Sequence, residues 1–198
     1  MQYIIVGLGN PGEEYEGTRH NTGRSVLEQF RKKNNFPEWE RDKNLKALIS
    51  KGTFGKEKNK IILVAPDNFM NMSGKSLPPL VKNSKDAERT IVAYDDLDLP
   101  LGTMKVSFNR SSGGHKGLES IIKALKTPAF ARLRIGISPV TASGKLKKPK
   151  GEEATIDFII GKFKKAELEV MGKTTKKAAE ALALILEVGR EQATGQIN

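Results

Sequence analysis

The chain has 198 residues, of which 37% are hydrophobic and 29% are charged, the composition of a globular protein with one sizeable core. It contains no cysteine, which excludes disulfides, thiol nucleophiles and cysteine-ligated metals. No apolar run approaches the ~20 residues of a membrane span, and the N-terminus enters a predicted strand without a signal-peptide segment. We therefore expect a cytoplasmic protein that makes no contact with a membrane.

The charge balance points to a polyanionic partner. Lys and Arg together number 34 against 23 acidic residues, a formal net charge of +11. Such an excess favours nucleic acid, because neutralising phosphates releases counterions and supplies affinity that does not depend on base sequence. The alternative is a solvated, lysine-rich surface on an ordinary protein. With only 6% aromatic residues, a base-stacking platform is disfavoured, and contact with backbone phosphates is the better hypothesis.

The first two dozen residues predict a strand that leads into a functional loop. Residues 3–6 form a short apolar run, typical of a strand buried on both faces. The chain then becomes polar and glycine-rich, and this loop contains Asn10, Tyr15, Arg19 and His20. An α/β sheet binds its ligands outside the carboxyl ends of its strands, so we expect the active site here.

The same stretch contains a dinucleotide-binding fingerprint that its context argues against. Residues 7–12 match G-x-G-x-x-G letter for letter. That fingerprint requires a helix to begin on the second or third glycine, so that the helix N-terminus meets the pyrophosphate. Here residues 13–17 bring carboxylates to the place of the anion and a glycine into the first turns. The acidic residue about 20 positions on would be Glu28, inside a predicted helix, so a dinucleotide enzyme is the weaker interpretation.

The rest of the chain alternates between predicted strands and helices. Val26, Leu27 and Phe30 recur at helical spacing, which predicts a helix over residues 22–34. Further helices are predicted from the end of the loop 66–74 to about residue 83, over 118–126 and over 164–189. Strands are predicted over 45–54, 60–65, 90–94, 103–108 and 132–137, with loops at 110–117 and 141–153.

These elements predict the fold class. We expect a single α/β domain over residues 1–198, with a twisted, mostly parallel mixed sheet flanked by helices on both faces. The long predicted C-terminal helix completes it. Pro78 and Pro79 are placed awkwardly for the second predicted helix, because proline lacks the amide hydrogen that a helix interior needs.

Polar side chains follow three of the buried strands at their carboxyl ends. If these strands are parallel, as right-handed crossovers favour, the ends share one edge of the sheet. That edge then gathers Asn10, His20, Asn71 and Asp95. A histidine suits a general base near neutral pH, an aspartate can hold its tautomer, and amide NH₂ groups can bind a developing oxyanion. Each residue alone is typical of a turn or a cap, but together they predict a hydrolytic site.

Other chemistries have weaker support. Asp95, Asp96 and Asp98 could hold Mg²⁺, but acidic residues after a strand more often cap or pair with Lys or Arg. His20 and His115 lack ligand-spaced partners in the sequence, which argues against a zinc site. No G-x-S-x-G motif occurs, so a serine nucleophile is disfavoured. We expect neither a metal nor a cofactor.

Six short motifs in order carry a resemblance to a known family. They are Val6–Gly12 with Tyr15, Thr18–Asn21, Phe69–Gly74, Asp95–Pro100, Gly113–Gly117 and Arg132–Gly136. Together they resemble bacterial-type peptidyl-tRNA hydrolase over nearly the whole chain. The resemblance implies a monomeric α/β hydrolase without a cofactor. Such an enzyme cleaves the ester between a peptide, or an N-blocked amino acid, and the tRNA 3′ ribose, and so recycles tRNA from peptidyl-tRNA released prematurely.

The resemblance also implies roles for individual positions. His20 would activate water and Asp95 would orient the histidine. The amides of Asn10 and Asn71 would hold the peptide carbonyl. The residues implied to line the substrate site are Tyr15, Met70 and Asn71, and Arg134 would contact a tRNA phosphate.

Two positions depart from the family's pattern. Lys116 replaces the usual Asn of Gly-His-Asn-Gly. A lysine can still bind a substrate carbonyl or phosphate, but beside His20 it would lower the pKa of the histidine and shift the pH optimum. Ser107 stands where a basic phosphate-clamping residue is often found. Basic residues that could bind tRNA in its place are Lys105, Arg110 and the lysines of the loop 145–150.

The alternative from another functional class is a non-catalytic RNA-binding relative that uses the same fold. Such a protein would keep the basic surface and lose the base–carboxylate pair. Here His20, Asp95 and both amides are present, which favours the hydrolase.

Overall fold

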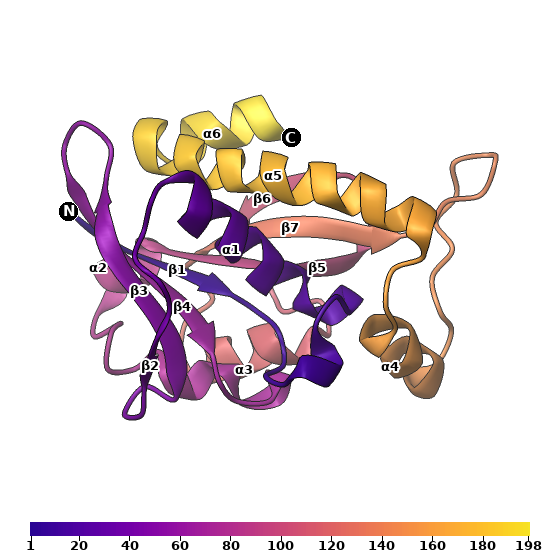
Figure 1. Ribbon diagram of the computed structural model, residues 1–198, viewed down its shortest axis with the longest axis horizontal. Helices are drawn as coiled ribbons and strands as arrows, with labels where there is room; N and C mark the ends of the chain where they lie inside the picture. The colour runs from indigo at the N-terminus through magenta and orange to yellow at the C-terminus, as the bar shows by residue number, and fades with distance from the viewer.

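The computed structural model describes residues 1–198 and contains one seven-stranded sheet with the strand order β2-β3-β4-β1-β5-β7-β6 (Figure 1). The strands are β1 (Gln2–Gly7), β2 (Glu40–Asp42), β3 (Ala47–Phe54), β4 (Asn59–Pro66), β5 (Thr90–Pro100), β6 (Met104–Phe108) and β7 (Ala131–Ser138). The central strands β4, β1, β5 and β7 run parallel, and β2, β3 and β6 pair antiparallel with their neighbours. The three buried strands of the prediction therefore do share one carboxyl edge.

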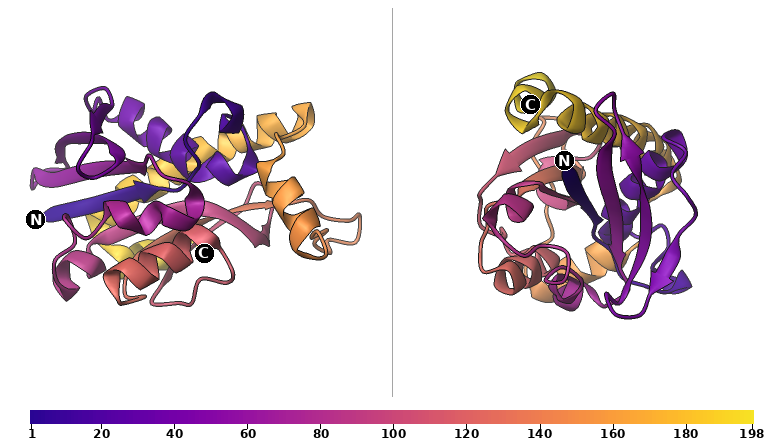
Figure 2. Two further views of the ribbon diagram at one scale, coloured as in Figure 1. Left: turned by 90° about the horizontal axis from the view of Figure 1, so that it is seen from below. Right: turned by 90° about the vertical axis from the view of Figure 1, so that its left-hand side faces the viewer.

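Helices cover both faces of the sheet, as predicted (Figure 2). One face packs against α1 (Thr22–Lys33), α5 (Lys165–Val188) and α6 (Arg190–Ile197), and the other against η3 (Met70–Ser76), α2 (Ser84–Glu88) and α3 (Lys116–Leu125). The alternation along β1 fills both cores, because Ile5 enters the first core whereas Ile4 and Val6 enter the second. No helix is long and apolar enough to cross a lipid bilayer.

The structure corrects the predicted elements between strands β4 and β5. No helix extends to residue 83; instead a 3₁₀ helix, η3, is followed by turns and by the five-residue helix α2. Pro78 and Pro79 explain the difference, because proline cannot donate the helical hydrogen bond and disfavours helical geometry in the residue before it. Strand β5 is also longer than predicted, so Asp95 and Asp96 lie within the strand and not in a loop.

Two helices are absent from the sequence prediction. Helix α4 (Glu152–Ile160) begins within the last residues of the loop predicted over 141–153. It buries none of its residues, so it lacks the apolar stripe that periodicity detects. Helix α6 is separated from α5 by Gly189, whose φ of 82° ends the longer helix. The side chain of Asn198, at the end of α6, pairs with the backbone of Val106 and so covers part of the edge strand β6.

The loop after β1 does not form a dinucleotide site. Gly12 is followed by the single-turn 3₁₀ helix η1 (Glu13–Tyr15), and the first α-helix begins only at Thr22. No helix N-terminus therefore stands at the glycine fingerprint to receive a pyrophosphate. The structure therefore argues against a dinucleotide-binding site, as the sequence context did.

Candidate active site

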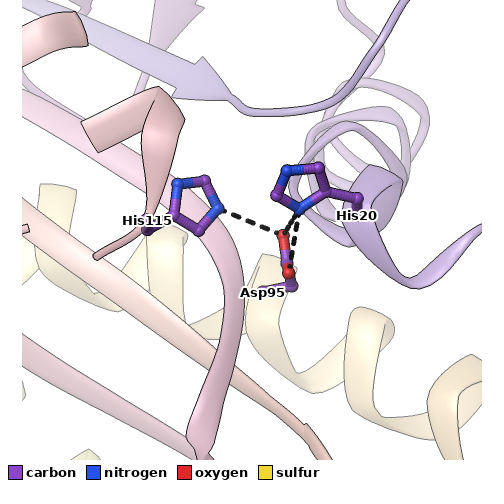
Figure 3. A group of neighbouring side chains, drawn as sticks. All are labelled: His20, Asp95 and His115. Atoms are coloured by element: carbon purple, nitrogen blue, oxygen red, sulfur yellow. Dashed lines mark hydrogen bonds and ion pairs between the residues drawn. The ribbon is translucent and has the colours of Figure 1, made fainter. Parts of the chain in front are cut away.

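His20 and Asp95 form a buried pair at the carboxyl edge of the sheet (Figure 3). Asp95 lies in β5, and His20 lies in the 3₁₀ helix η2 (Arg19–Asn21) directly ahead of α1. Nδ1 of His20 is 3.0 Å from Oδ1 and 3.1 Å from Oδ2 of the carboxylate. The other ring nitrogen of His20 points away from Asp95 (Figure 3). Nε2 is therefore the nitrogen that remains open for proton transfer.

Burial and charge set the protonation of this pair. Burial disfavours the imidazolium of His20, but the charge of Asp95 and its hydrogen bond outweigh burial, so the pKa of His20 is raised. Burial also disfavours the carboxylate form of Asp95. The charge of His20 and hydrogen bonds from His115 and His20 prevail and hold the pKa of Asp95 well below its usual range. Asp95 is thus an anion that can stabilise positive charge on His20.

Lys116 is not among the groups that set the pKa of His20. Burial lowers this pKa and Asp95 raises it more, whereas the lowering expected from Lys116 stays a prediction. The Lys116 ammonium lies 3.6 Å from the carboxylate of Glu119 on the same helix, and its side chain is 63% exposed. Glu119 and solvent therefore screen this charge, while the buried carboxylate acts on the histidine at contact distance.

His115 is a third member of the cluster, and the sequence analysis left it out of the site. It occupies the N-cap of α3, and its Nε2 lies 3.3 Å from Oδ1 of Asp95 (Figure 3). Each of these three residues, His20, Asp95 and His115, has one atom that could bind a metal, and the three atoms lie within 4.8 Å of one another. Spacing along the chain therefore does not exclude a metal here, because the fold brings together residues that are far apart in the sequence. The sequence signal that could have identified His115 was its position shortly before the predicted helix 118–126.

Asn10 is held so that its NH₂ group is free. Its Oδ1 accepts a hydrogen bond from the Met70 amide at 2.8 Å, which identifies the other side-chain atom as the NH₂. The backbone of Asn10 is fixed by Asn21, which accepts from its N–H at 2.8 Å and donates to its carbonyl at 2.9 Å. Asn21 was not predicted from the sequence as a functional residue. Asn10 can thus offer a donor from a rigid, buried position.

The η3 segment packs directly against the start of α3. A Cβ on Gly117 would lie 2.5 Å from Sδ of Met70, and one on Gly74 would lie 2.1 Å from the Ser120 carbonyl oxygen. Only glycine permits these approaches, which explains the glycines of both motifs. Met70 is buried where it contacts Gly117, in the first turn of the helix that His115 caps.

The remaining predicted substrate residues lie beside this packed core. Tyr15 meets the exposed ring of Phe69 edge to face, with ring centroids 6.4 Å apart. Asn71 is exposed, and no hydrogen bond joins it to His20, Asp95 or Asn10. Hydrogen bonds thus join His20 to Asp95 and tie Asn10 through Asn21 to η2, the element that carries His20, and they leave Asn71 outside this network.

A basic groove of about 1000 Å³ opens from the His20–Asp95 pair. Its lining includes the predicted tRNA-binding residues Lys105, Arg110 and Arg134. It also includes Lys116, which stands where the family usually has Asn. Lys105 and Arg134 are cross-strand neighbours on β6 and β7. Arg134 donates to Asp96 at 2.7 Å, so part of its charge is already neutralised within the protein. Lys148 of the predicted loop also lines the groove and pairs with Asp98.

A buried arginine lies next to position 107, where the family often has a basic residue that binds phosphate. Ser107 faces Arg132 across β6 and β7, and Arg132 is only 1% exposed. The Arg132 guanidinium donates to the Arg110 carbonyl, while its Nε and Nη1 and the hydroxyl of Ser107 have no partner within the protein. This region of the groove therefore keeps a positive charge although residue 107 has none. Arg132 was not predicted from the sequence as a functional residue.

Arg19 ties the His20 segment to the C-terminal part of the chain. Its guanidinium donates to Glu167 at 2.7 Å and to the carbonyls of Gly161 and Lys162 at 3.1 and 2.8 Å. The rings of Phe158 and Phe163 lie against it, with centroids 4.4 and 5.0 Å away. This buried cross-link holds η2 against the end of α4, and α4 lines the groove with Thr155, Ile156 and Ile159.

Comparison with known proteins places this geometry in one family. The family model described as Peptidyl-tRNA hydrolase matches residues 4–198. A peptidyl-tRNA hydrolase of Alkaliphilus oremlandii is 40% identical over 188 residues, which cover 94% of each chain. One of Aquifex aeolicus is 38% identical, covering 98% of this chain and 95% of its own.

Solved structures agree with the sequence comparison. The crystal structure of peptidyl-tRNA hydrolase from Acinetobacter baumannii superimposes with a TM-score of 0.86 at 32% identity, covering 99% of this chain and 94% of its own. The match thus extends over the entire sheet and its helices. This chain belongs to the peptidyl-tRNA hydrolase family.

Proposed function

We propose that this protein hydrolyses the ester that joins a peptide, or an N-blocked amino acid, to the 3′ ribose of tRNA. Membership of the peptidyl-tRNA hydrolase family supports the reaction class. The observation that carries the proposal is the buried His20–Asp95 pair, which opens directly into a basic groove. A general base beside a phosphate-binding surface is what hydrolysis of a tRNA ester requires.

His20 acts as the general base in this proposal. Nδ1–H donates to Asp95, so Nε2 carries the lone pair and takes a proton from water as the water oxygen attacks the ester carbonyl carbon. The ionised carboxylate of Asp95 fixes this tautomer and stabilises the imidazolium that forms. When the carbonyl–oxygen bond breaks, the imidazolium returns its proton to the ribose oxygen that leaves.

Asn10 stabilises the oxyanion of the tetrahedral intermediate. Its NH₂ group is held rigidly because its Oδ1 and its backbone are both engaged. A donor fixed in advance stabilises developing charge without reorganisation, which is why such donors contribute strongly to catalysis. Asn71 is proposed as a second amide that contacts the substrate, from its exposed place beside Met70.

Substrate and tRNA bind along the groove and its rim. Tyr15, Met70 and Lys116 contact the peptide side in this proposal. Lys105, Arg110 and Arg134 bind tRNA phosphates, and their place on the groove lining supports this role. Of these three residues, Arg134 is expected to contribute least to phosphate binding, because its Nε already donates to Asp96.

The proposal includes a cytoplasmic monomer that needs neither a metal nor a cofactor. The His20–Asp95 pair and Asn10 supply a base, its orienting group and an oxyanion donor, which together suffice for ester hydrolysis. Activity that survives dialysis against a chelator and size-exclusion chromatography at the monomer mass are the expected results. Activity restored only by an added metal would contradict this part.

The decisive experiment follows release of tRNA from N-blocked aminoacyl-tRNA with the wild type and His20→Ala. General-base catalysis predicts a loss of roughly 10²–10⁴-fold in the variant with tRNA affinity largely unchanged. Lys85→Ala on α2, an exposed substitution at the other end of the sheet, is the matched control and should equal the wild type. Tight, salt-sensitive tRNA binding without turnover in any variant would favour the non-catalytic RNA-binding relative.

A further inference from the structure

The hydrogen bonds of His115 define its tautomer. Its Nδ1 accepts from the backbone N–H of Gly117 at 3.1 Å and of Leu118 at 3.4 Å, as the N-cap of α3. An atom that accepts two N–H groups cannot itself carry a proton, so the proton of the neutral ring resides on Nε2. Nε2 lies 3.3 Å from Oδ1 of Asp95, so its N–H donates to that oxygen (Figure 3).

We propose that His115 is a positioning residue whose locked Nε2–H holds the Asp95 carboxylate in line with Nδ1 of His20. The inference rests on the function proposed above. Oδ1 of Asp95 receives both histidines, one from η2 and one from the N-cap of α3. Two donors from different elements restrict rotation of the carboxylate, and a fixed carboxylate fixes the ring of the base. Helix capping and orientation of the base thus share one side chain.

The same hydrogen bonds argue against a metal at this cluster. His20, Asp95 and His115 are close enough together to resemble a ligand set. A metal on Nε2 of a neutral His115 would require the proton on Nδ1, where it would face two backbone N–H donors. His115 is therefore arranged to donate to Asp95 and not to ligate a cation.

Two aromatic rings pack against His115 and hold its ring in place. The ring of Tyr94 meets it edge to face at a centroid distance of 4.9 Å, and the His20 ring lies at 5.0 Å. The titratable groups that contact the cluster are Asp95 and Tyr94 from β5, His20 from η2 and His115 itself.

Two substitutions separate the two tasks of the side chain. Asn at position 115 can present an acceptor near the place of Nδ1 and is a good N-cap, but it is too short to reach Asp95. Gln can present an NH₂ near the place of Nε2 but is a poor N-cap. We expect His115→Asn to keep the wild-type melting temperature and lose ten- to a hundredfold in kcat with little change in KM. His115→Gln should keep kcat and melt about 2–4 °C lower.

The pH profile supplies a readout that a capping role alone would not move. Without the competing donor, the charge of Asp95 acts on His20 alone and water can enter, and both effects raise the pKa of His20. The rise of kcat/KM with pH should therefore shift to higher pH in His115→Asn and stay in place in His115→Gln. Asn83→Ala, which removes the side-chain cap of the distant helix α2, should lower the melting temperature without moving the profile.

Any other pattern overturns the proposal. Activity that follows the cap, with His115→Asn active and His115→Gln impaired, would make His115 a structural cap only. A wild type that lacks hydrolytic activity would overturn the proposed function but would leave the tautomer open to test. Long-range ¹H–¹⁵N spectra of the ¹⁵N-histidine-labelled wild type should identify His115 as the Nε2–H tautomer and His20 as the Nδ1–H tautomer. An Nδ1–H tautomer at His115 would overturn the inference without any variant.

Discussion

His20 and Asp95 are 75 positions apart in the sequence, yet Nδ1 of the histidine lies within 3.1 Å of both carboxylate oxygens. The carboxylate is 2% exposed and the imidazole 8%. In such surroundings an ion pair is screened little by solvent, so each residue controls the protonation of the other.

Asp95→Asn should lower kcat by roughly 10³–10⁴-fold, because an amide neither stabilises the imidazolium nor enforces the tautomer. The direction in which this substitution shifts the pH profile follows from the pKa of His20. Asp95 raises the pKa of His20 against the effect of burial, so removing the charge lets burial lower that pKa. The unprotonated base then exists at lower pH, and the residual kcat/KM should rise with pH earlier than in the wild type. A profile displaced to higher pH would contradict the assignment of Asp95.

Asn10→Asp should lower kcat by roughly 10²–10³-fold with a small change in stability. Asp retains an oxygen that accepts from the Met70 amide, but it loses the NH₂ donor and brings a negative charge to the oxyanion. Asn10→Ala removes the donor and the link to Met70 together, so it should also lower the free energy of unfolding by about 1 kcal/mol. Steady-state kinetics and urea denaturation test the pair. Full activity in Asn10→Asp would exclude the oxyanion role.

Lys105→Ala and Arg110→Ala should weaken tRNA binding and leave kcat nearly unchanged at saturating tRNA. Each removes one groove-lining charge, so the slope of log Kd against log salt should fall by about 1. Filter binding or fluorescence titration over a salt series measures the slope. Lys85→Ala again serves as the comparison, and equal slopes for all three variants would place the tRNA elsewhere.

Arg19→Met should lower the free energy of unfolding by about 3 kcal/mol, because it leaves the Glu167 carboxylate largely buried without its partner. Methionine keeps much of the packing against Phe158 and Phe163, so the loss reports chiefly on charge and hydrogen bonding. Arg19 immediately precedes His20, and kcat should fall as the base loses its position. Urea denaturation of Arg19→Met and Glu167→Gln tests this cross-link, and unchanged stability in both would refute it.

Much of the fold could be predicted from the sequence, because local pattern and burial agree in its core. The apolar runs at β1, β4 and β5 must be buried on both faces, and parallel strands with right-handed crossovers bring their ends to one edge. That reasoning was sufficient to select Asn10, His20 and Asp95 before any contact was known. It failed where no apolar stripe exists, as in α4, and where Pro78 and Pro79 interrupt the helical pattern.

The sequence alone indicated which side chains stand at the carboxyl edge of the sheet, since buried apolar runs mark parallel strands and right-handed crossovers bring their ends to one edge. Only the tertiary structure decided which atoms meet there. It joined His115 to Asp95 through the N-cap of α3, paired Lys116 with Glu119 so that its charge does not set the pKa of His20, and placed Arg132 behind Ser107. Such contacts depend on distances of a few ångströms between elements far apart in the chain, and residue patterns along a sequence carry no record of those distances.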